Sequence, residues 1–149
     1  MTELRGEARD VALAETQTVL ALARDDSMRA RLADLVGHVD EGAVDGELAE
    51  LLESVLELGL QTGRIRAYYG PGGEQAAVST LRRLPRGRAR SKSTSDVSAA
   101  LGALAGKRLD GVSISAVAPG AFTVSFDAEG VELSVRLDAN GARVTSVSA

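Results

Sequence analysis

A tyrosine pair beside a glycine-rich turn is the first group of residues that could bind a ligand. The local sequence is RIRAYYGPGGE, and the apolar spacing after it predicts a helix over residues 74–84. Glycines ahead of a helix N-terminus leave backbone N–H groups that can face an anion. The candidate anion-binding residues are Arg64, Arg66, Tyr68, Tyr69, Gly72 and Gly73. The alternative is a tight turn between two helices, since Glu74 already supplies a negative charge at that helix end.

A dense run of cations follows this turn. Six positive side chains fall within eleven residues: Arg82, Arg83, Arg86, Arg88, Arg90 and Lys92. Such a run can bind phosphates without sequence preference, with an affinity that falls steeply as salt rises. No aromatic residue is interleaved, and no helix with base-reading side chains follows. We therefore rank nucleic-acid binding behind two other interpretations. The run is a solvated linker, or it faces the acidic helices of its own chain, of another copy or of a protein partner.

Few residues are available for catalysis. His38 is the only histidine, cysteine is absent, and only two lysines occur, so most nucleophile–base pairs cannot be assembled. The acidic residues after His38 lack the alternating spacing of a calcium loop. The GALAGKR segment also fails as a phosphate loop, because three residues rather than four separate its glycines. We expect no enzyme activity, no cofactor and no metal site.

Charge is segregated along the chain. Residues 1–60 hold 5 basic and 14 acidic side chains, whereas residues 61–92 hold 8 basic and only 1 acidic. Segregation of this kind bears on partners and assembly rather than on fold. No apolar run approaches the ~20 residues that cross a bilayer, and the first residues are charged. These features predict a cytoplasmic protein with no membrane span.

The first part of the chain is patterned as helices. Apolar residues recur at helical spacing over residues 2–23 and 27–39, and most clearly over 45–69. In that third segment a wide leucine-rich stripe lies opposite a row of glutamates. Its phase continues through Gly63, so we expect one helix that ends at the Gly70-Pro71 break. The width of the stripe predicts self-association through it.

The last part of the chain changes period. After a predicted helix at residues 96–105, four runs alternate between apolar and polar residues, and the connections APGA, DAEG and DANG are typical of hairpins. The short connections leave no room for parallel crossovers. The prediction is an α+β protein in which a helical segment is followed by a helix and a four-stranded antiparallel β-meander. Its regions are an acidic helical part (1–85, with a Gly/Pro corner at 70–73), a mobile basic linker (86–95) and a helix-plus-sheet part (96–149).

These features favour a non-catalytic interaction protein. We expect a small scaffold, adaptor or accessory subunit that binds a protein partner or forms a homo-oligomer through charge-segregated surfaces. The first alternative is a nucleic-acid-associated regulator that uses residues 82–92. The second alternative is a sensor of a small anionic ligand at the tyrosine–glycine corner.

Overall fold

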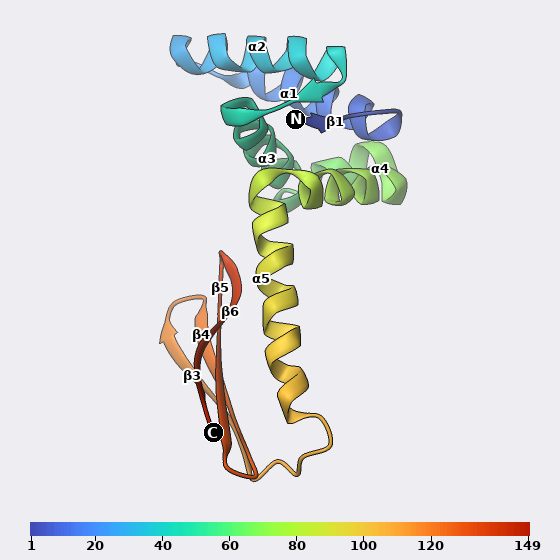
Figure 1. Ribbon diagram of the computed structural model, residues 1–149. Coiled ribbons are helices and arrows are strands. Elements are labelled where there is room, and N and C mark those ends of the chain that lie inside the picture. Colours follow the sequence, from blue (N-terminus) through green and yellow to red (C-terminus); the bar gives the residue numbers. More distant parts are fainter. The chain divides into compact units, whose positions relative to one another are not determined.

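The computed structural model describes all residues from 1 to 149 and divides into two compact units, Met1–Arg88 and Ala89–Ala149 (Figure 1). Five α-helices and a four-stranded antiparallel sheet confirm the predicted α+β class. No helix combines the length and the apolar character that crossing a membrane requires.

The first unit is helical. Its helices are α1 (Glu7–Leu22), α2 (Asp26–Glu41), α3 (Gly46–Gln61) and α4 (Arg64–Arg83), and α5 (Pro85–Leu101) begins in it. Two short strands, β1 (Thr2–Glu3) and β2 (Ala43–Val44), pair antiparallel and join the N-terminus to the turn after α2. Gly42 ends α2 in the left-handed conformation, and its carbonyl accepts a 2.8 Å hydrogen bond from the Leu4 amide.

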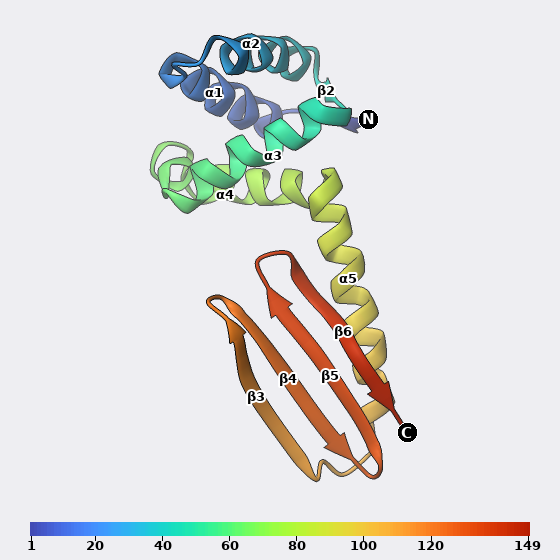
Figure 2. The same ribbon diagram turned by 90° about the vertical axis from the view of Figure 1, so that its left-hand side faces the viewer.

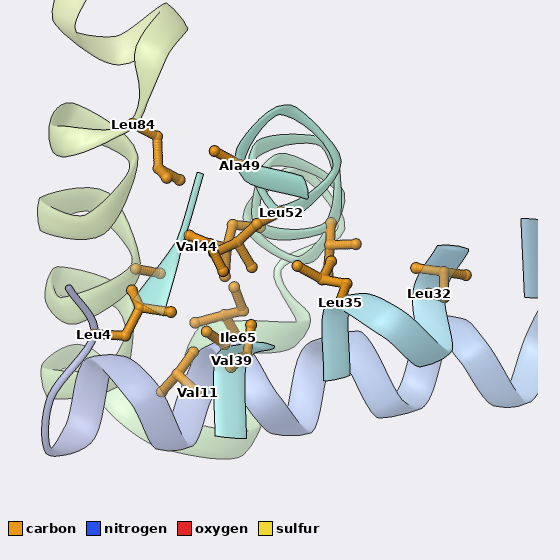
Figure 3. Packing of buried hydrophobic residues seen from close by; sticks show 14 residues of the cluster. Leu4, Val11, Leu32, Leu35, Val39, Val44, Ala49, Leu52, Ile65 and Leu84 are labelled. Carbon is orange, nitrogen blue, oxygen red and sulfur yellow. The ribbon is translucent and has the colours of Figure 1, made fainter. Parts of the chain in front are cut away.

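The apolar stripe of α3 lies in the core of this unit. Leu52 and Leu56 are fully buried, and they belong to the same cluster as Leu35 of α2 and Ile65 of α4. Figure 3 shows side chains of α1, α2, α3 and α4 meeting in this cluster. The stripe was predicted to be the surface for self-association. This prediction is wrong, because other helices of the same chain cover the stripe.

The predicted single helix over residues 45–69 is also wrong. Helix α3 ends at Gln61, and Gly63 adopts a left-handed φ of 71° that no helix interior accommodates. The periodic pattern continued across this point because Ile65, at the start of α4, is buried in the same core. The expected Gly/Pro break is present, since Gly70 has φ 68° and ψ −169° and kinks α4 just before Pro71.

The mobile linker predicted at residues 86–95 is wrong, because these residues are helical and belong to α5. Pro85 is the first residue of α5, a position where its fixed φ suits a helix and its missing N–H costs nothing. Arginine is also a good helix former. The helix predicted at 96–105 is thus the last part of a longer one, followed by a 3₁₀ turn at Gly102–Leu104.

The second unit contains the sheet. Strands β3 (Gly111–Ala118), β4 (Ala121–Ala128), β5 (Val131–Asp138) and β6 (Gly141–Ser148) lie in sequence order, each antiparallel to the next. This arrangement confirms the predicted meander, and each hairpin is closed by two residues. Figure 2 shows the four strands side by side, with β3 and β6 at the two edges.

Helix α5 covers only part of the apolar face of this sheet. Val97 of α5 packs with Leu133 and Val135 of β5 in a small buried cluster. The partly buried side chains around it come from α5, the 3₁₀ turn after it, β4 and β6, and none comes from β3. The helix that was expected to cover the sheet therefore covers the part of the apolar face around β5 and leaves the β3 side open (Figure 1). On β6, Val147 is exposed as well.

Candidate interaction surface

Strand β3 is an unprotected sheet edge. All eight of its residues, GVSISAVA, are exposed, and none carries a charge or is a proline. Charged side chains, prolines, bulges or a covering element usually keep edge strands from pairing with a further strand. The one irregularity in β3 is a register shift between Ala116 and Ala118, near its end. Residues 111–116 therefore present a regular row of backbone donors and acceptors on their outer side.

An uncovered apolar surface adjoins this edge. The β3–β4 register places Val112 opposite Phe126, Ile114 opposite Val124 and Ala116 opposite Phe122. Directly opposed residues share a face of the sheet. Val112 is 55% exposed and Ile114 is 68% exposed, which is high for side chains on the face that α5 covers elsewhere. The apolar face of the sheet is thus left uncovered by α5 on its β3 side.

The tyrosine–glycine corner places its cations against carboxylates of the same chain. Arg64 donates to the carboxylate of Glu15, which is 1% exposed, and Arg66 donates to Glu74 at 2.8 Å. Tyr69 is partly buried beside Glu15, and this burial, with the neighbouring negative charge, raises the pKa of its hydroxyl. These pairings stabilise the corner and leave less positive charge for an external anion.

The remaining corner residues do not converge on one point. Tyr68 is 77% exposed, whereas Gly73 lies against Tyr69 and Val11 in the interior of the unit. The space next to Gly72 is taken by the carboxylate of Glu7. An open hollow of about 470 Å³ is lined by Arg66 together with Arg82 of the basic run, but Glu74 lines it too. The arrangement agrees better with a structural turn than with an anion site.

Arg86 of the basic run is engaged in an internal contact. Its backbone N–H and its Nε each donate to the Glu53 carboxylate at 2.7 Å, and the Gly87 N–H donates at 3.2 Å. Glu53 is 1% exposed, and it therefore supplies the acceptor for the first N–H groups of α5. The hydrogen bond to Glu53 is the main cause that raises the pKa of the Arg86 guanidinium.

The other cations of the run do not share one face. Arg82 and Arg83 belong to α4, and the Arg83 guanidinium donates to the Glu3 carbonyl at 3.2 Å. Within α5, Arg88 and Lys92 are four residues apart and share a side of the helix. Arg90 is about 200° around the helix from Arg88 and lies beside Gly141 of β6. Arg83 and Arg86 are thus engaged by groups of the first unit, and fewer than six cations of the run are open to a phosphate backbone.

Sequence reasoning missed the two buried glutamates and the open edge. Glu53 belongs to the row of glutamates predicted opposite the leucine-rich stripe, and nothing in the sequence singled out Glu15. Their arginine partners are 33 and 49 residues away. The alternation in β3 predicted the strand, but not which half of the sheet would lack a cover. Comparison of the chain with protein-family models, with curated proteins and with solved structures found no match.

Proposed function

We propose that this chain is a non-catalytic interaction protein, a small scaffold, adaptor or accessory subunit that binds a protein partner or a second copy of itself. The observation that supports this proposal is the uncharged edge of β3 beside the uncovered apolar half of the sheet. An exposed edge strand offers backbone hydrogen bonds to an incoming strand, and alternate side chains supply specificity.

The exposed apolar side chains give this surface its binding energy. Val112, Ile114 and Phe122 lie at or next to the β3 edge, and each is at least 41% exposed. Apolar area removed from water stabilises a complex by about 25 cal/mol per Å² before the costs of association are subtracted. Contiguous apolar patches on a protein surface commonly mark sites of interaction.

The segregated charges fit the same function. Acidic side chains dominate residues 1–60, and basic side chains dominate residues 61–92. Complementary charges on two binding partners orient them and speed their encounter. Nucleic-acid binding through residues 82–92 ranks below this proposal, because Arg86 is paired with Glu53 and the other cations of the run do not share one face.

The test is affinity purification from the source cell with tagged wild-type chain and tagged Ile114→Lys. We expect the wild type to retain a defined protein in fixed stoichiometry, either untagged copies of this chain or another protein, and we expect Ile114→Lys to lose it. Ile114 is 68% exposed, so the substitution leaves the core of the unit intact. Retention of the same proteins by both forms would refute the proposed surface.

A further inference from the structure

The pattern of β3 is complementary to itself when two copies run antiparallel. Val112, Ile114 and Ala116 alternate with Ser113 and Ser115. If Ile114 of one copy lies opposite Ile114 of another, Val112 faces Ala116 and Ser113 faces Ser115. Both the apolar face and the serine face then continue across the junction. A partner strand of another kind would need the same alternation to match both faces.

From this complementarity we infer that β3 pairs with β3 of a second copy and joins two four-stranded sheets into one eight-stranded sheet. The inference rests on the proposed function and names its partner. The pairing uses residues 112–116, which lie in the regular part of β3, before the register shift. Backbone groups on the outer side of β3, which face water in the single chain, then find partners in the second copy.

No charge opposes this arrangement. Strand β3 has no ionisable side chain, and Asp110 is the nearest charged residue. With Ile114 on the two-fold axis, the two copies of Asp110 lie at opposite ends of the junction. They are about 27 Å apart at ~3.4 Å per residue, well beyond the screening length of about 8 Å at physiological salt. The junction therefore brings no like charges together.

The pairing also places the uncovered apolar surfaces together. Val112, Ile114 and Phe122 of each copy lie near the middle of the joined face, while each α5 covers the part of its own sheet around β5. Strand pairing removes from water only the apolar side chains nearest the junction, so the contact is small for a protein–protein interface. We therefore expect a weak, reversible dimer.

The experiment measures the mass of the chain in solution by sedimentation equilibrium over a range of about 1 to 100 μM, in which a weak dimer dissociates on dilution. The wild type should pass from 15.4 kDa to twice that mass as concentration rises. Ile114→Lys places two like charges opposite each other on the axis and should weaken the dimer by ~10-fold or more. Ile114→Glu should do the same.

A mixture of the two variants supplies the decisive comparison. The introduced lysine of one chain would lie opposite the introduced glutamate of the other, so the mixture should dimerise more tightly than either variant alone. This rescue also shows that both variants are folded. Val147→Lys is the matched control, because Val147 is similarly exposed, at 59%, but lies on the opposite edge strand, β6. It should dimerise like the wild type.

Three results would overturn the inference. They are a wild-type chain that stays monomeric throughout the range, a dimer that Ile114→Lys leaves intact, and a dimer that Val147→Lys disrupts while Ile114→Lys does not. A monomeric wild type that nevertheless retains another protein through Ile114 in the affinity purification would refute the self-pairing alone. The proposed function would fail separately, if neither experiment depended on Ile114.

Discussion

A close contact of α3 with Glu15 and Ile65 leads to a sharp prediction about Gly59. A Cβ at this position of α3 would lie 2.5 Å from Glu15 Oε2 and 2.8 Å from two carbon atoms of Ile65. Both neighbours are fully buried, and Glu15 is held by its ion pair with Arg64. Neither side chain can move aside without disturbing the core or exposing the charge. Alanine should therefore be destabilising here, although it is the better helix former.

The size of the effect follows from two opposing contributions. Replacing glycine by alanine inside a helix gains about 1 kcal/mol of helix propensity. Overpacking a core site costs typically about 1–3 kcal/mol, and displacing a buried hydrogen-bonded carboxylate adds about 1–3 kcal/mol. We expect Gly59→Ala to lower the free energy of unfolding by about 1–5 kcal/mol net.

Gly37 of α2 provides the matched control. It is helical and exposed, and nothing lies within 4 Å of the position of its Cβ. Gly37→Ala should raise the free energy of unfolding by about 0.5–1 kcal/mol. Urea unfolding followed by tyrosine fluorescence measures both variants, because the chain has no tryptophan and both tyrosines belong to the first unit. A Gly59→Ala variant as stable as the wild type would refute the described contact of α3 with Glu15 and Ile65.

Three further predictions follow from the same structure. Leu52→Ala should lower the free energy of unfolding by about 2–5 kcal/mol, because Leu52 is fully buried. Leu58 is exposed, and Leu58→Ala should change the free energy of unfolding by less than about 0.5 kcal/mol. Equal effects of the two substitutions in urea unfolding would contradict the assignment of the α3 stripe to the core. The pKa of Asp138 is lowered below 3.8 mainly by the Asn140 backbone N–H, and also by Arg143 and Arg136. Its carboxylate therefore contributes stability above that pH, which is lost as the pH falls through the lowered pKa. Asp138→Asn should accordingly melt at a lower temperature than the wild type at pH 7 but not in strong acid, and a gap that widens in acid would contradict this sign. Titration with double-stranded DNA at physiological salt should show no binding, because the cations of residues 82–92 lack a common face; tight binding that is lost when Arg88 and Lys92 are neutralised would favour the alternative function.

The sequence predicted well what depends on local pattern. Alternation and hairpin chemistry gave all four strands of the meander, and Gly70-Pro71 marked a true change of chain direction. The errors at Gly63 and at 86–95 have a common origin. A glycine can continue a helix or reverse it, and a proline can end one helix or begin the next. The choice at each place depends on residues distant in the sequence, such as Glu53, whose carboxylate receives the first amides of α5.

The candidate sites were harder to predict, because they depend on which surfaces stay open. The sequence shows that Arg64 and Arg86 are cations, but not that Glu15 and Glu53 are buried beside them. It shows that β3 is apolar on one face, but not that a single helix covers only the part of the sheet around β5. Pairing and coverage are properties of the folded chain, and no local periodicity encodes them.

The most direct test of the central claim is amide hydrogen exchange at strand β3 as a function of protein concentration. If β3 is the interaction surface and pairs with itself, exchange of the peptide that spans residues 111–118 should slow as concentration rises. Exchange in β6, the other edge strand, should stay unchanged. Exchange in β3 that is independent of concentration and of added partner, or protection that appears at β6 instead, would contradict the account.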